Sequence, residues 1–208
     1  MPDVGKTGKT GKTGNTEQME WAAAGRARLR EIIVAKSLLS GGDFQLASGK
    51  TSSVFFDMKP AMLDPEGANL IAAGVLDLLR GDNDVDHIGG LVMGAVPLIG
   101  AVCVRSFPDR PLAGFFVRKE PKERGTRRMI EGNLAPGASV ALLEDVTTTG
   151  GSVLKAVAAV READARVAKV VTIVDRLEGA AENLAREGLD LAALFTRDDF
   201  LASAADAR

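Results

Sequence analysis

Acidic, hydroxyl and glycine residues follow one another between positions 144 and 152. Glu144 and Asp145 end an apolar run that begins at Val140 and is typical of a buried strand. Glycine-rich turns, hydroxyl groups and the start of a helix together favour binding of a phosphate monoester. Carboxylates can accept hydrogen bonds from sugar hydroxyls or help to hold a divalent cation. The segment therefore predicts a site for a phosphorylated sugar, made by Glu144, Asp145, Val146, Thr147, Thr148, Thr149, Gly150, Gly151 and Ser152.

The alternative interpretation is a polar strand-to-helix turn whose Thr and Ser side chains only cap the following helix. Taken alone, the Thr-Thr-Gly-Gly part fits that interpretation equally well. The full order, an apolar strand followed by Glu-Asp-Val-Thr-Thr-Thr-Gly-Gly-Ser, is much more specific. We therefore favour phosphate binding.

A second cluster is basic, although the chain has a net charge of −2. Pro121 and Gly125 within it disfavour a regular helix, so the segment is predicted to be a loop. Such a loop could close over a phosphorylated ligand, neutralise growing negative charge and exclude water. The alternative is a solvated charged turn. The cluster consists of Arg118, Lys119, Lys122, Arg124, Arg127 and Arg128.

Arg176 and an aromatic pair could bind a flat anionic ring. Arg176 follows an apolar strand and could hold a carboxylate through two parallel hydrogen bonds. A surface ion pair with Asp175 or Glu178 is the alternative. Phe55 and Phe56 could form an aromatic wall, but adjacent strand residues face opposite sides, so at least one belongs to the core.

These segments resemble the orotate phosphoribosyltransferase family of the type I phosphoribosyltransferases, and the resemblance extends from about residue 28 onward. Residues 140–152 resemble the family's phosphoribosyl-pyrophosphate signature, and residues 115–125 its catalytic loop. Residues 46–57 are similar to its base-binding segment, and residues 174–179 to the strand end where an arginine meets orotate. The resemblance implies the type I phosphoribosyltransferase fold, with a small N-terminal hood.

The resemblance also implies an activity and its partners. The expected reaction joins orotate to phosphoribosyl pyrophosphate, with Mg²⁺ carried by the pyrophosphate and ribose near Glu144 and Asp145. A homodimer that shares its basic loop between subunits is implied as well. The resemblance assigns catalysis to Lys122, Glu144 and Asp145. It assigns the binding of orotate to Phe55, Phe56, Thr148 and Arg176. It assigns the binding of phosphoribosyl pyrophosphate, the donor of the sugar phosphate, to residues 144–152 and to Arg118, Lys119, Lys122 and Arg124.

Three positions depart from the family pattern. Arg124 stands where the family loop usually has a histidine, and arginine does not exchange protons near neutral pH. Many relatives have a lysine where this chain has Ala47, and some have one in the turn at residues 93–97. Two alternatives therefore stay open: a phosphoribosyltransferase for another base, such as uracil or a purine, and a regulatory protein that binds the donor without turnover.

The elements that position these residues alternate along the chain. Apolar strands separated by helices predict an α/β fold with a mostly parallel sheet covered on both faces, and ligands bind beyond the carboxyl ends of such strands. We expect a strand pair at residues 44–47 and 54–58, and later strands at 88–93, 112–118, 139–143, 169–174 and 191–195. We expect helices at 17–39, ended by Gly41-Gly42, and at 64–79, 97–106, 151–163 and 178–187.

Composition limits the remaining possibilities. The charge balance gives no general attraction to nucleic acid or membranes, and we predict a cytoplasmic protein with neither as partner. Single residues of Cys and His, Cys103 and His87, exclude an internal disulfide framework and a His-rich zinc site, and both are predicted to be structural. Residues 1–16 repeat Gly-Lys-Thr without phosphate-loop spacing and are predicted to form a flexible tail before a single domain at 17–208.

Overall fold

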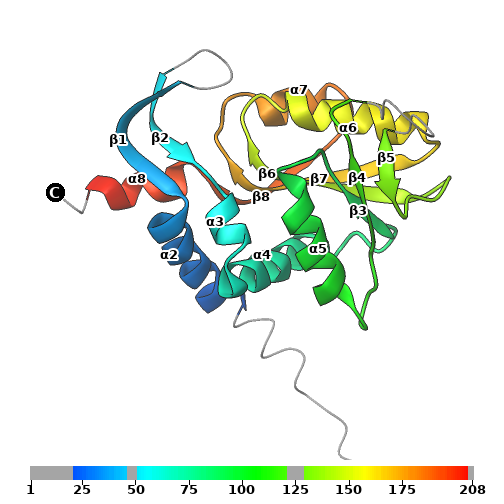
Figure 1. The fold of residues 1–208 in the computed structure, drawn as a ribbon, viewed down its shortest axis with the longest axis horizontal. Helices are drawn as coiled ribbons and strands as arrows, with labels where there is room; N and C mark the ends of the chain where they lie inside the picture. Colours follow the sequence, from blue (N-terminus) through cyan, green and yellow to red (C-terminus); the bar gives the residue numbers. More distant parts are fainter. Residues whose placement is uncertain (1–20, 46–50, 121–128, 206–208) are drawn as a thin grey trace, which may run out of the picture.

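The computed structural model describes residues 21–45, 51–120 and 129–205 (Figure 1). The Gly-Lys-Thr segment, Ala47, Lys122, Arg124, Arg127 and Arg128 lie outside these ranges.

A six-stranded sheet forms the centre, in the order β5-β4-β3-β6-β7-β8. Five strands are parallel, and β5 is antiparallel to β4 at one edge. The prediction of a mostly parallel sheet is confirmed. The strands are β3 (His87–Gly89), β4 (Ala113–Val117), β5 (Ile130–Gly132), β6 (Ser139–Thr147), β7 (Arg166–Asp175) and β8 (Leu191–Thr196).

Helices cover both faces of this sheet, and each face has its own apolar cluster. One cluster contains fully buried residues of α4 (Pro65–Leu78) and α5 (Ala95–Ser106). The other contains residues of α6 (Gly151–Glu162) and α7 (Ala180–Ala185). Figure 1 shows these two pairs on opposite sides of the strands. Burial on both faces explains why β6 reads as a continuous apolar run.

The N-terminal part differs from the predicted single helix. A short π-helix (Trp21–Gly25) and α2 (Arg26–Lys36) are followed directly by β1 (Leu38–Gln45), which pairs antiparallel with β2 (Thr51–Phe56). Gly41-Gly42 therefore does not end a helix. The two glycines lie in β1, where the register with β2 shifts between Ser40 and Phe44, so they form part of a β-bulge. This hairpin is the hood that the resemblance implies (Figure 1).

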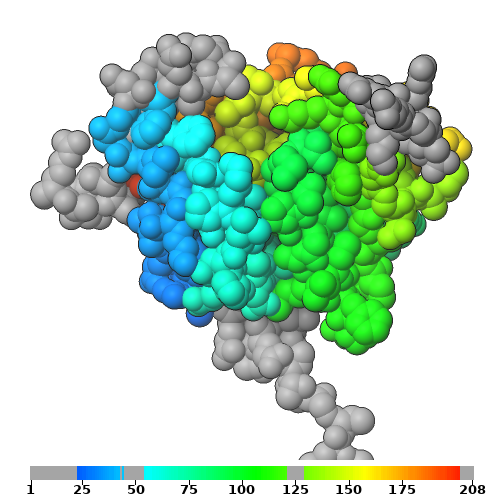
Figure 2. Space-filling view, viewed as in Figure 1, coloured from blue at the N-terminus to red at the C-terminus, as the bar shows by residue number. Residues whose placement is uncertain are grey.

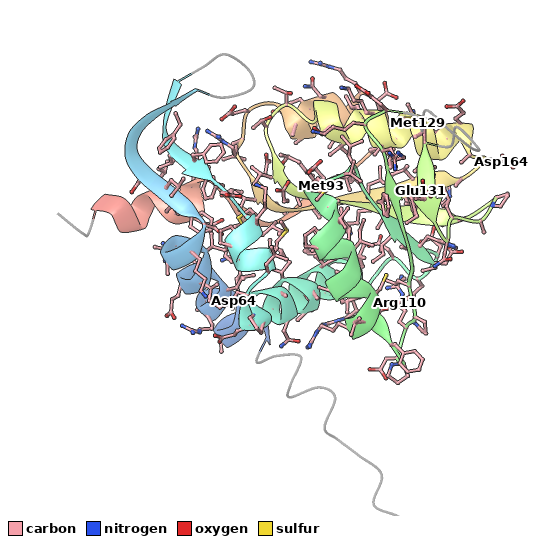
Figure 3. All side chains as sticks on the ribbon, in the orientation of Figure 1. Asp64, Met93, Arg110, Met129, Glu131 and Asp164 are labelled. Atoms are coloured by element: carbon pink, nitrogen blue, oxygen red, sulfur yellow. The ribbon has the colours of Figure 1, made fainter. Side chains whose placement is uncertain are left out.

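The predicted start of the helix at residue 64 is confirmed. Asp64 Oδ1 accepts hydrogen bonds from the backbone N–H groups of Glu66 at 3.1 Å and Gly67 at 2.9 Å, and Pro65 occupies the first helical position. Figure 3 shows Asp64 at the start of α4. Such a cap contributes about 1 kcal/mol.

Several strands differ in length from prediction, and the differences in β3 and β6 matter for the chemistry. β3 stops at Gly89, so residues 90–94 form the connection to α5. β6 continues to Thr147, so Glu144 and Asp145 belong to the strand itself. Three elements were not predicted: β5, α3 (Lys59–Met62) and α8 (Asp198–Ala205). Each is short and lacks a periodic apolar pattern long enough to recognise.

Cys103 and His87 have the structural surroundings that were predicted. Cys103 Sγ would lie 2.6 Å from a Cβ at Gly114, so the thiol packs against β4, and its burial raises its pKa. His87 Nδ1 lies 2.7 Å from Asp86 Oδ1. In the part of the chain that the structure describes, every helix is too short or too polar to cross a lipid bilayer.

Candidate functional site

The order of the strands locates the site. β3 has β4 on one side and β6 on the other, so the chain changes direction across the sheet at β3 and β6. Ligands in such sheets bind at the carboxyl ends of the strands beside this switch. Arg118 and Lys119 follow β4, Glu144 and Asp145 lie in the last part of β6, and Arg176 follows β7. Apart from Phe55 and Phe56 in β2, the predicted site residues within the described ranges therefore lie along one edge of the sheet.

The space-filling view places this edge between two parts of the surface. Figure 2 shows the yellow surface around α6 between the cyan surface of β2 and α3 and the green surface of α5 and β4. The site is thus bordered by the hood on one side and by the β3–β4 part of the sheet on the other.

Asp145 is held against the connection between β3 and α5. Its Oδ1 accepts a hydrogen bond from Val146 N at 3.0 Å. A Cβ at Gly94 would lie 2.5 Å from the same oxygen, so any larger residue there would displace the carboxylate. Gly94 precedes α5, and Met93 beside it is labelled in Figure 3. The turn at residues 90–94 and the acidic pair therefore form one surface.

Glu144 is nearly completely buried, with 7% of its surface exposed. Burial, and then the neighbouring Asp145 carboxylate, raise the pKa of Glu144 to about 9, while the positive charge of Lys119 acts weakly in the opposite direction. At neutral pH the free protein therefore holds a proton on Glu144. A protonated carboxyl can donate as well as accept a hydrogen bond, which suits a sugar hydroxyl.

Replacing Glu144 by glutamine is expected to stabilise the free protein. Below its usual pKa of 4.5, Glu144 is protonated in both the folded and the unfolded protein. Above that pH, Glu144 ionises in the unfolded protein but keeps its proton in the folded protein up to about pH 9. Wild-type stability should therefore fall as pH rises through this window, by an amount on the order of 1–3 kcal/mol near pH 7.5. We expect Glu144→Gln to remove this loss.

Thermal unfolding of the two proteins between about pH 5 and pH 9 measures the effect. The difference in melting temperature should be small at the acidic end and grow with pH. Glu162→Gln, at an exposed position of α6, should behave like the wild type throughout. Parallel stability curves for Glu144→Gln and the wild type would contradict a proton held on Glu144.

The phosphate loop does not act as a side-chain cap for α6. The residue that caps the helix is Gly150, whose φ of +80° is left-handed, and among the described residues no side chain donates or accepts a capping hydrogen bond there. Thr147 Oγ1 donates instead to Asp175 Oδ1 at 3.1 Å, and Asn183 Nδ2 donates to Thr149 O at 2.8 Å. The interpretation of these hydroxyls as simple caps is therefore wrong, and the start of α6 is available to an anion.

Arg176 is buried, with 3% of its surface exposed, so the alternative of an ion pair at the surface is wrong. The pair itself exists: Arg176 Nε lies 3.1 Å from Glu178 Oε1. Neither Arg176 Nε nor Glu178 Oε2 has a hydrogen-bond partner within the described residues. A buried guanidinium without a full set of acceptors is suited to a planar carboxylate ligand.

Asp175, which the sequence suggested only as a partner for Arg176, has another role. Its Oδ1 accepts from Thr147 Oγ1 and from Leu177 N, both at 3.1 Å. Arg176 N also donates to Thr147 O at 2.9 Å. The end of β7 is therefore tied to the beginning of the phosphate loop.

The aromatic pair separates into two roles. Phe56 is buried and packs edge-on against Phe200, with ring centroids 5.2 Å apart, so its ring belongs to the core. Phe55 is 36% exposed and stacks on Phe44 at 5.8 Å. Of the two, only Phe55 offers a ring face that a flat base can reach.

Two described cations of the basic cluster lie where β4 ends. Arg118 N donates to Met129 O at 2.8 Å, and its NH1 lies 3.7 Å from Glu131 Oε1 on β5. Figure 3 shows Met129 and Glu131 on the β5 side. Lys119 is exposed and close enough to Glu144 to affect its pKa. Lys59, which the sequence analysis missed, approaches Asp145 from the hood side. Its position two residues after Asp57, next to the aromatic pair, was the available signal.

The acidic pair fits a metal that arrives with its ligand. Within the described part of the chain, no three His, Cys, Asp or Glu side chains gather to hold a metal ion. Mg²⁺ commonly binds through one or two carboxylates together with substrate phosphates. Glu144 and Asp145 could supply that share.

Known proteins of the same kind match this chain over most of its length. A family model described as a phosphoribosyl transferase domain matches residues 64–190. Orotate phosphoribosyltransferase of Rhodopseudomonas palustris (strain BisB18) is 50% identical over 186 residues, covering 87% of this chain and 98% of that protein. The enzyme of the same name from Aquifex aeolicus (strain VF5) is 44% identical over 179 residues, covering 85% and 97%.

A solved structure extends the comparison to three dimensions. Mycobacterium tuberculosis H37Rv orotate phosphoribosyltransferase, in complex with 5-phospho-α-D-ribosyl 1-diphosphate, matches with a TM-score of 0.70 at 34% identity. The match covers 84% of this chain and 98% of that one.

Proposed function

This chain belongs to the orotate phosphoribosyltransferase family, and we infer that it transfers ribose 5-phosphate from phosphoribosyl pyrophosphate to orotate. The products are orotidine 5′-monophosphate and pyrophosphate, a step of pyrimidine biosynthesis. The observation that carries this inference is the meeting of three groups at one sheet edge: the acidic pair of β6, the start of α6, which no described side chain caps, and buried Arg176.

Each group suits one part of the reaction. The 5-phosphate would bind the loop at residues 147–152, where backbone N–H groups and the helix dipole favour an anion. The ribose hydroxyls would bind Glu144 and Asp145. The orotate carboxylate would bind Arg176, with Thr148 and the ring of Phe55 beside the base.

The chemistry needs positioning and charge stabilisation more than a protein nucleophile. The bond between the anomeric carbon and the pyrophosphate oxygen breaks, positive charge develops on the ribose, and a ring nitrogen of orotate forms the new bond. Arg118, Lys119, Lys122 and Arg124 are proposed to neutralise the departing pyrophosphate. Aligning two bound reactants and stabilising developing charge supply most of the acceleration in such reactions.

We propose that Glu144 and Asp145 would help to hold an Mg²⁺ ion carried by the donor. When bound, it supplies positive charge that offsets the pyrophosphate oxygens. Asp145, half-buried and oriented by Val146 N, is the carboxylate placed to face it, while Glu144 is suited to the ribose.

We also propose a homodimer in which the basic loop serves the neighbouring subunit's site. The family resemblance supports this assembly, and Leu63, Met93 and Phe107, each about 70% exposed, are candidates for burial between copies. A single free cysteine supports a reducing cytoplasm as the place of action.

Mixing the purified protein with orotate, phosphoribosyl pyrophosphate and Mg²⁺ should lower the absorbance of orotate as product forms. The loss should require all components. If uracil or a purine is consumed instead, the base assignment is wrong. If the donor binds and no base in such a panel reacts, the chain is a regulatory relative, and Arg124 in place of the usual histidine is the feature to revert first.

A further inference from the structure

Lys59 is a cation at the site with no assigned role. Its Nζ donates to Asp57 Oδ1 at 2.6 Å, and 62% of its side chain is exposed. Asp57 is itself 37% exposed. Exposed pairs of this kind contribute little stability, so the ammonium can exchange its partner at low cost.

The backbone around Lys59 is fixed, although its side chain is open. Met58 is fully buried, and Asp57 N donates to Ser37 O at 2.9 Å. Ala61 N donates to Ser37 Oγ at 3.1 Å. Ser37, the residue that ends α2, thus holds the segment on both sides of Lys59, so the backbone position of the lysine is fixed.

That point faces the acidic pair. α3 packs against α5, and α5 begins immediately after Gly94, which contacts the Asp145 carboxylate. The hydrogen bond to Asp57, and to a smaller extent the charge of Asp145, raise the pKa of Lys59. Figure 1 shows α3 between the hairpin and the start of α5. The charges of Lys59 and Asp145 therefore lie close enough to interact, as those of Lys119 and Glu144 do.

We propose that Lys59 binds the pyrophosphate group of the donor, exchanging Asp57 for phosphate oxygens when the donor enters. This inference rests on the proposed function. The 5-phosphate is assigned to the loop after β6 and the orotate carboxylate to Arg176 after β7. The remaining anion then falls on the opposite side of β6, toward β3 and the turn at Gly94, where Lys59 lies. A further cation there fits a chain with Ala47, and no lysine at residues 93–97.

Steady-state kinetics of Lys59→Ala test the proposal in both directions of the reaction. We expect KM for phosphoribosyl pyrophosphate, and KM for pyrophosphate in the reverse reaction, to rise roughly tenfold or more, as for other hydrogen bonds to charged groups. KM for orotate should stay within about twofold. Lys59→Arg should restore most of the donor affinity. Asp57→Asn, which removes the competing carboxylate, should leave donor affinity equal or higher.

Lys36→Ala is the matched control, because Lys36 forms a similar exposed pair with Asp64 at 2.5 Å, away from the sheet edge. It should leave all three KM values unchanged. Calorimetric titration with pyrophosphate, on variants shown to be folded by their melting curves, gives a second measure. Unchanged KM and affinity in Lys59→Ala overturn the proposal, and so does a rise in KM for orotate alone. A wild type that fails to consume orotate counts against the proposed function instead.

Discussion

Replacing Lys122 by alanine should lower turnover by roughly 10²–10³-fold, the cost of removing one group that stabilises charge in a transition state. Lys122 lies outside the described residues, and the expectation rests on the basic loop that the sequence places between β4 and β5. KM for orotate should change little, because the lost contact is made to the departing pyrophosphate. Initial rates with saturating substrates measure the effect.

Two controls give this prediction its meaning. Lys155→Ala, at an exposed position of α6, should keep full activity. Mixing Lys122→Ala with Asp145→Asn should recover about a quarter of wild-type activity if each loop serves the neighbouring subunit, because half of the dimers then contain one intact site. Wild-type turnover in Lys122→Ala removes the residue from the mechanism, and a mixture without recovery argues against a shared loop.

Replacing Arg176 by alanine should lower kcat/KM for orotate by roughly 10²–10³-fold while donor binding persists, since truncating one partner of a buried charged pair typically costs 2–5 kcal/mol. The guanidinium is buried beside Glu178, with Nε lacking a hydrogen-bond acceptor among the described residues. Kinetics with varied orotate, together with calorimetric titration of the donor, separate the two effects.

Arg176→Lys tests geometry against charge. Lysine keeps the positive charge near Glu178 but has no planar pair of donors, so most of the orotate affinity should still be lost. Arg161 is an exposed arginine whose NH1 lies 2.8 Å from Glu187 Oε2, and Arg161→Ala should change the affinity for neither orotate nor the donor. An Arg176→Ala protein that remains folded and keeps wild-type KM for orotate would show that the base carboxylate binds elsewhere.

The mostly parallel sheet could be predicted because β6 and β7 are long apolar runs with a clear helix between them. Its strand order, and with it the switch at β3 and β6, is visible only in the structure. The segment at residues 144–152 could be recognised as the family's signature because its residue types and their order are specific, and phosphate binding there stays a prediction. The strands of the hood could not be placed correctly, because Gly41-Gly42 looks like the end of a helix. Only pairing with β2 shows that the glycines lie in a strand. Local sequence cannot report a long-range partner.

The side-chain environments were the least predictable part of the site. Phe55 and Phe56 are identical in type, and only the packing of Phe200 from the end of the chain decides which of them is core. Lys59 was overlooked for a similar reason: its nearness to Asp145 depends on α3 packing against α5. Contacts between residues of separate elements cannot be read from the spacing of residues along the chain.

The carboxylate of Asp175 restricts how this protein could acquire a different base. It holds Thr147 of the phosphate loop and Leu177 beside Arg176 with the same oxygen. A substitution in the strand end that reshapes the base site will therefore also shift the loop that grips the donor, and residues that share a partner in this way do not change independently. Selectivity would evolve more easily at Phe55, whose ring stacks on Phe44 of the same hairpin and not on the phosphate loop.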